Sequence, residues 1–126
     1  MREFRVTLGH RVGDLARLTE TLAMHDMNLK SVAGITDANK AILCLVVQDV
    51  STMRAALNEA RIQFEEAEVL SELLEDEPGQ VAELASKLAN ARVNINSIYI
   101  LARDSPLIEM GFTVDDPKKA KKVLAE

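Results

Sequence analysis

The sequence predicts an α+β fold that contains two consecutive βαββαβ units, each an antiparallel sheet with helices on one face. The chain repeats itself at an offset of 66 residues, so that residues 12–32 align with residues 78–98 without a gap. Within each copy, stretches with strand periodicity alternate with stretches with helical periodicity. A single extended stretch joins the copies, which is typical of a duplicated small domain rather than of a repeat array.

Seven of the 21 aligned pairs are identical. They are Gly13/Gly79, Ala16/Ala82, Leu18/Leu84, Leu22/Leu88, Ala23/Ala89, Asn28/Asn94 and Ser31/Ser97. Beyond this stretch, Ile42/Ile108 and Asp49/Asp115 keep the same offset. We therefore expect corresponding elements at corresponding positions of the two units.

The first unit begins with an alternation of apolar and polar residues over Phe4–Gly9, which predicts a strand with one buried face. Leucines at helical spacing predict a helix from about Gly13 to His25. The segments Leu29–Thr36 and Ala41–Gln48 are apolar and flank a polar turn, so they predict a hairpin. Ser51 is a good N-cap for a second helix.

The second unit repeats this order. Pro78 stands where the start of a helix tolerates proline, and a leucine-rich stripe follows it. Asn94–Ala102 and Leu107–Val114 predict another hairpin. Asp116 can cap a last helix, with Pro117 at its first position.

Each unit therefore predicts the split βαβ, or ferredoxin-like, arrangement. Because two full copies need eight strands and only six stretches are found, the long stretch Phe64–Leu74 is expected to close the first unit and open the second. We place the units at 1–68 and 69–126. The second unit lacks its last strand, which leaves an open sheet edge. A second chain is the natural cover for such an edge, so we expect a homodimer or a larger assembly.

Composition limits the classes of partner. The net charge of −5 and the pI of about 5.1 argue against nucleic acid or an anionic membrane as the main partner. One cysteine, Cys44, excludes an internal disulfide and fits a reducing cytoplasm, where its mid-strand position favours a buried, inert thiol. No nucleophile–base pair, phosphate-binding glycine loop or metal-ligand cluster is found, so neither catalysis nor a metal or cofactor is expected.

The glycines before the two first helices suggest a ligand site. A helix N-terminus offers unpaired N–H groups and a partial positive charge, which suits a carboxylate. Gly13 and Gly79 let a ligand approach this backbone closely because they carry no Cβ. An asparagine side chain, Asn28 or Asn94, can donate to one ligand group and accept from another. The simpler interpretation is that the glycines only permit a tight turn and the asparagines only end a helix.

The pattern resembles the ACT domain, a small-molecule-sensing module of amino-acid metabolism. The resemblance rests on a glycine at the first strand-to-helix turn and an asparagine at the start of the second strand, in both copies. Its residues are His10–Ala16 with Met27–Leu29 and Asp76–Ala82 with Val93–Ile95. Asn96–Tyr99 and Asp115–Pro117 also resemble stand-alone tandem ACT proteins without a catalytic domain.

This resemblance implies reversible binding of a free amino acid or a similar small molecule, and regulation rather than catalysis. It also implies that ligands lie at interfaces between units. Because Gly13 and Asn28 should lie at opposite ends of one unit, the Gly13 loop is expected to face an Asn94 and the Gly79 loop an Asn28. The predicted ligand-binding residues are His10, Arg11, Val12, Gly13, Asp14, Leu15 and Asn28, and Asp76, Pro78, Gly79, Gln80, Val81 and Asn94.

The two loops differ in charge. His10 and Arg11 before Gly13 suit an anion, whereas Asp76 and Glu77 before Gly79 would repel a carboxylate. The Gly13 loop is therefore the favoured carboxylate site. The alternative function is a regulatory or interaction subunit of a biosynthetic enzyme, in which one or both pockets no longer bind a ligand.

Overall fold

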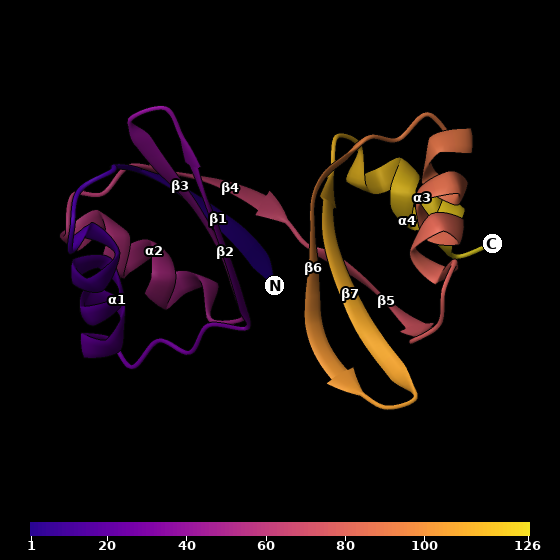
Figure 1. Cartoon of the computed structure of the whole chain (residues 1–126), viewed down its shortest axis with the longest axis horizontal. Helices are drawn as coiled ribbons and strands as arrows, with labels where there is room; N and C mark the ends of the chain where they lie inside the picture. The colour runs from indigo at the N-terminus through magenta and orange to yellow at the C-terminus, as the bar shows by residue number, and fades with distance from the viewer. The chain divides into compact units, whose positions relative to one another are not determined.

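The computed structural model describes all residues, 1–126, and divides into two compact units, Met1–Ala67 and Glu68–Glu126. Figure 1 shows the elements of both units in chain order. Unit 1 contains β1 (Arg2–Gly9), α1 (Asp14–Met24), β2 (Ser31–Asp37), β3 (Lys40–Val47), α2 (Val50–Glu59) and β4 (Phe64–Glu68). Unit 2 contains β5 (Leu70–Glu75), α3 (Gln80–Asn90), β6 (Ile95–Asp104), β7 (Leu107–Val114) and α4 (Pro117–Leu124). None of the four helices has the length and hydropathy that a membrane-spanning helix requires.

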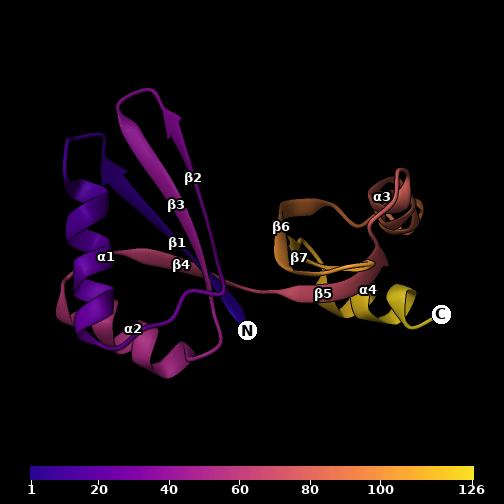
Figure 2. The same ribbon diagram turned by 60° about the horizontal axis from the view of Figure 1, so that its bottom comes forward.

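Unit 1 is a four-stranded sheet in the order β2-β3-β1-β4, with α1 and α2 on one face (Figure 2). Its core forms where alternate residues of β1 and β3 meet the apolar stripes of the two helices. The buried members are Phe4, Val6, Leu18, Leu22, Leu43, Leu45, Val47, Met53, Ala56 and Leu57. This is the predicted βαββαβ unit with helices on one face.

Unit 2 has a three-stranded sheet in the order β5-β7-β6. In unit 1 the last strand, β4, pairs with the first strand, β1. In unit 2 no strand pairs with the free edge of β5, so the prediction of a missing last strand is confirmed. Its core is smaller and equally aliphatic. The buried members are Leu70, Leu84, Leu88, Val93, Phe112, Val114 and Ala120.

The stretch Phe64–Leu74, which the sequence predicts as one strand, is two strands, β4 and β5, in different sheets. The interruption lies at Val69. Val69 and Leu70 are both buried, although successive residues of one strand point to opposite faces. The chain therefore leaves one sheet at this pair and enters the other.

The offset between the two copies also increases by one residue within β6. Leu8 pairs with Ala41 in unit 1, and the equivalent Leu74 pairs with Ile108 in unit 2, so the offset has grown from 66 to 67 (108 minus 41). The pairs Ile42/Ile108 and Asp49/Asp115 that the sequence suggests are therefore wrong. The counterpart of Asp49 is Asp116, and both residues cap a helix.

The extra residue of unit 2 is Leu101. The register of β6 on β7 passes from Ile100↔Met110 directly to Ala102↔Glu109, which makes Leu101 a bulge. Its side chain is buried against Gly111, where an added Cβ would lie 2.6 Å from Leu101 Cδ1. The insertion is therefore accommodated by the absence of a side chain on the neighbouring strand.

Two predicted helix starts are wrong. The N-cap of α2 is Asp49 rather than Ser51, because the Asp49 carboxylate accepts from the Thr52 backbone N–H at 3.3 Å and its charge suits the helix dipole. Pro78 lies before the N-cap of α3 rather than at the first helical position, since Gly79 takes the cap with a positive φ that proline cannot adopt. The predicted cap at Asp116 is confirmed, with Pro117 at the first position of α4.

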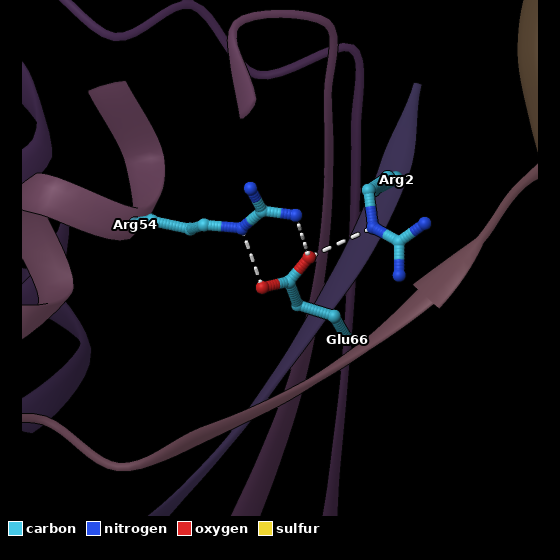
Figure 3. A network of polar contacts seen from close by, with 3 residues as sticks. All are labelled: Arg2, Arg54 and Glu66. Atoms are coloured by element: carbon cyan, nitrogen blue, oxygen red, sulfur yellow. Dashed lines mark hydrogen bonds and ion pairs between the residues drawn. The ribbon is translucent and has the colours of Figure 1, made fainter. Parts of the chain in front are cut away.

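A three-residue ion-pair network joins β1, α2 and β4 (Figure 3). Glu66 Oε2 accepts from Arg54 Nε at 2.7 Å, and Glu66 Oε1 accepts from Arg54 and from Arg2 Nε, each at 2.8 Å. The bidentate bond from Arg54, followed by the bond from Arg2, holds the pKa of Glu66 below its usual value against the opposing effect of burial. The network fixes the edge strand β4 to both of its neighbours.

We expect Glu66→Gln to destabilise unit 1 by about 1 kcal/mol, because the arginines are partly exposed and solvent screens the pair. Since the folded pKa is lowered, the contribution of Glu66 is present above the unfolded value of 4.5 and is lost as the pH falls through the folded value. Urea unfolding of both proteins at pH 7 and pH 3 measures the difference. Glu65→Gln, on the exposed neighbour, is the control; equal effects of the two substitutions at pH 7 would contradict the role of the network.

The end of α1 is tied to α2 by His25. Its Nδ1 lies 2.9 Å from the Thr21 carbonyl oxygen and its Nε2 lies 3.0 Å from Glu59 Oε2, so both ring nitrogens face acceptors. Only the protonated ring can donate to both. The contact with Thr21, and then that with Glu59, raise the pKa of His25 above its usual value.

We expect the stabilising effect of His25 to depend on pH. Since its folded pKa is raised, the contribution is fully present below the unfolded value of 6.5 and is lost as the pH rises through the folded value. The difference in unfolding free energy between the parent and His25→Gln should therefore be larger at pH 5.5 than at pH 8.5. A difference that is equal at the two pH values, or larger at pH 8.5, would argue against the protonated contact; Glu59→Gln should reduce the pH dependence.

Candidate functional site

The turn between the first strand and the first helix has the same backbone conformation in both units. Gly13 is the N-cap of α1 with φ 88°, and Gly79 is the N-cap of α3 with φ 91°. This left-handed conformation is readily adopted only by glycine, and neither cap provides a side chain to bond the first turn. Both glycines are therefore needed for the turn. The first helical N–H, of Asp14 or Gln80, donates to a carbonyl of the turn, and the next two N–H groups of each helix remain available to a ligand.

In unit 1 the turn borders a cavity of about 350 Å³. Five of the predicted site residues line it: His10, Arg11, Gly13, Asp14 and Leu15. Val12 does not, because its side chain is fully exposed. Asn28 is also absent from the lining.

The opposite wall of the cavity was not predicted. It comes from β2 and β3 and consists of Gly34, Ile35, Thr36, Ala41 and Leu43. Gly34 keeps this wall open: an added Cβ would lie 2.8 Å from Leu43 Cδ2, and the counterpart of Gly34 in unit 2 is Ile100. The small residues of β2 could have indicated this wall from the sequence. Their part in it, however, becomes visible only when the pairing of β2 with β3 is known.

The charges at the Gly13 turn are partly balanced within it. Asp14, the first residue of α1, accepts from Arg11 Nε at 3.3 Å and also from Arg17. Burial opposes ionisation of Asp14, but the bonds from Arg11 and Arg17 outweigh it and lower the pKa of this carboxyl. Two guanidinium groups thus share one carboxylate, which leaves the turn with excess positive charge.

The Gly79 turn of unit 2 is built differently. Asp76 is paired with Arg103 at 3.7 Å, and Glu77 follows it, so the turn carries excess negative charge. Gln80 lines a cavity of only about 140 Å³, together with Glu83 and Lys87. Open space lies around Gly79, and Val81 is partly exposed.

The two asparagines have different environments. The backbone N–H of Asn94 donates to Asp115 Oδ1 at 3.0 Å, and its Nδ2 donates to Asp115 Oδ2 at 3.2 Å. Asn94 therefore ties the start of β6 to the end of β7, a structural role that differs from the helix-ending role the sequence suggested. The side chain of Asn28 is exposed and makes no hydrogen bond within the chain. The predicted approach of each asparagine to a glycine turn of another unit stays a prediction.

Comparisons with known proteins give no match to a family model and no match among curated proteins. Solved structures do match over 98% of this chain. A protein from Bacteroides thetaiotaomicron has a TM-score of 0.88 at 22% identity, over 85% of its own chain. The ligand-free regulatory subunit of aspartate kinase from Thermus thermophilus has a TM-score of 0.69 at 13% identity, over 89% of its chain. A structure of aspartokinase α and β subunits has a TM-score of 0.67 at 13% identity, over 88% of its chain.

These likenesses establish the fold. The chain has the ACT-type, ferredoxin-like fold in two consecutive copies, as the sequence predicts.

We expect Asn94→Ala to destabilise unit 2 by about 1 kcal/mol, because it removes a charge-assisted bond on an exposed part of the surface. Asn28→Ala is the matched control, since the side chain of Asn28 makes no comparable bond. Urea unfolding of the two variants measures the difference. Equal stability of the two variants would show that the bond to Asp115 contributes nothing.

Proposed function

We propose that this chain is a regulatory protein that binds a free amino acid with a small apolar side chain at the Gly13 turn of unit 1. The observation that carries the proposal is the cavity of about 350 Å³ between this turn and the β2–β3 wall. Its volume lies within the range of small-molecule sites, which is roughly 300–1,000 Å³. The cavity has polar residues at the Gly13 turn and a mainly apolar lining elsewhere.

The polar end suits the ligand carboxylate. The start of α1 offers N–H groups that no side chain caps, and the helix dipole favours a negative charge there. Arg11 and Arg17, which share the Asp14 carboxylate, add excess positive charge. A carboxylate bound at this end would therefore meet both hydrogen-bond donors and a favourable potential.

The apolar end suits a short aliphatic side chain. Leu8, Leu15, Ile35 and Leu43 line it, and Leu15 and Ile35 are largely exposed in the chain alone. A ligand that covers these side chains gains roughly 25 cal/mol for each square ångström of apolar surface that it removes from water. A charged side chain would gain less, because these apolar residues offer it no partner.

The regulatory part of the proposal is supported by the likeness of the fold to the regulatory subunit of aspartate kinase. Binding would regulate only if the ligand has different affinity for two states of the protein. We propose, as the sequence suggests, that the protein has no catalytic activity of its own, that it works in the cytoplasm, and that it forms a homodimer or a larger assembly. The alternative is an interaction subunit of a biosynthetic enzyme that binds no amino acid itself.

Thermal unfolding with each of the twenty amino acids at 10 mM tests the proposal. Binding to the folded state alone raises the unfolding midpoint, and we expect this for alanine, valine, leucine or isoleucine but not for lysine or glutamate. Gly34→Ile, which gives unit 1 the residue of unit 2, should abolish the shift by filling the cavity.

Ile100→Ala, at the counterpart position in unit 2, should leave the shift unchanged. The proposal fails if no amino acid raises the midpoint of the parent protein. Co-purification of an enzyme with a protein that binds no amino acid would instead support the alternative.

A further inference from the structure

A second and larger cavity, of about 680 Å³, lies in unit 1 outside the Gly13 site. β1, β4 and the connection from α2 to β4 form it. Its polar lining residues are Arg5, Thr7, Asn58, Arg61, Gln63 and Glu65. None of these residues belongs to the predicted ligand site, and none lines the cavity at the Gly13 turn.

Arg61 is held at the rim of this cavity by its backbone. It follows the C-cap of α2 with φ 58°, and two hydrogen bonds close the helix around it: Arg61 N–H to the Asn58 carbonyl at 3.1 Å and Ile62 N–H to the Leu57 carbonyl at 2.9 Å. Glycine or asparagine usually takes this left-handed position, because other side chains are strained there. The backbone thus fixes where the Arg61 side chain begins.

The charge of Arg61 is not neutralised within the chain. Its guanidinium makes no hydrogen bond or ion pair, and neither do the side-chain amides of Asn58 and Gln63. Arg2 and Arg54, in contrast, are bound to Glu66, and Arg5 lies 3.7 Å from Glu3. The lining thus holds two arginines, two amides and one carboxylate, Glu65, which is an excess of positive charge in a chain whose net charge is −5.

An adjoining groove of about 470 Å³ extends the same positive region. Arg61 and Gln63 line both hollows. Arg11 and Arg17 also line the groove, together with Asp14, whose carboxylate they share, so the groove keeps an excess of positive charge. Since guanidinium groups bind the oxygens of phosphate and carboxylate in a two-pronged geometry, this arrangement suits an oxyanion. Glu65, at the β4 side of the cavity, would repel a second anionic group and accept from a hydroxyl group.

We propose that this cavity is a second small-molecule site, which binds a hydroxylated compound through a single phosphate or carboxylate group, with Arg61 as the principal contact. The oxyanion lies between Arg61 and the amides of Asn58 and Gln63. The hydroxyl groups lie toward Glu65 and Thr7. The site is independent of amino-acid binding at the Gly13 turn.

Calorimetric titration at low salt tests the site with four probes: inorganic phosphate, glucose 6-phosphate, gluconate and glucose. We expect saturable binding of glucose 6-phosphate, of gluconate or of both, weaker binding of inorganic phosphate and none of glucose. The two sugar acids separate a phosphate preference from a carboxylate preference. Affinity should fall as salt is added, because the contact is between exposed charges.

Arg61→Gln should weaken binding on the order of tenfold, because a charge-assisted contact is lost. Arg61→Lys should weaken it less, since the charge remains. Arg92→Gln is the matched control: Arg92 has the same position after α3 and nearly the same conformation, φ 61°, but lies in unit 2. Thermal unfolding without a probe checks that all three variants are folded.

Weaker binding in Arg61→Gln with unchanged binding in Arg92→Gln supports the site. The proposal is overturned if no anionic probe binds saturably at millimolar concentration, if glucose binds as well as glucose 6-phosphate, or if Arg61→Gln binds like the parent. An amino-acid shift that survives in Arg61→Gln would leave the Gly13 site intact, so the failure of either site is distinguishable from failure of the other.

Discussion

Each unit depends on a backbone conformation that glycine adopts without strain and other residues rarely adopt, at the turn from its first strand to its first helix. Gly13 and Gly79 have φ values of 88° and 91°, so the chain can reverse within a few residues and return its helix across the sheet. The same residue type leaves the helix start uncapped. One local requirement of the fold therefore creates, in the same place, the donors that an anionic ligand needs.

The two copies have kept this turn and have diverged around it. Unit 1 has Gly34 beside the turn and a positive loop, whereas unit 2 has Ile100 and a negative loop. Asn94 is bound to Asp115, while Asn28 makes no bond within the chain. These differences lie in side chains rather than in topology, so a duplicated fold has retained its architecture while its two surfaces have become chemically unlike.

The sequence was sufficient to predict the fold because hydrophobic periodicity and an internal repeat can both be read directly along the chain. The strands and the first helix begin and end within two residues of their predicted bounds, apart from the stretch that divides at Val69. Of the cavity at the Gly13 turn, only the loop side was predicted, through His10, Arg11, Gly13, Asp14 and Leu15, because a loop is read along the chain. Its second wall, at Gly34 and Leu43, depends on strand pairing, and the cavity at Arg61 depends on the meeting of β1, β4 and a helix end. Neither arrangement corresponds to a pattern of neighbouring residues in the sequence.

The Leu101 bulge couples two positions on neighbouring strands. A Cβ at position 111 would lie 2.6 Å from Leu101 Cδ1, well inside van der Waals contact, so a side chain there requires the Leu101 side chain to move. The two positions are therefore expected to show epistasis: a substitution of Gly111 should cost less stability once Leu101 is replaced by a smaller residue.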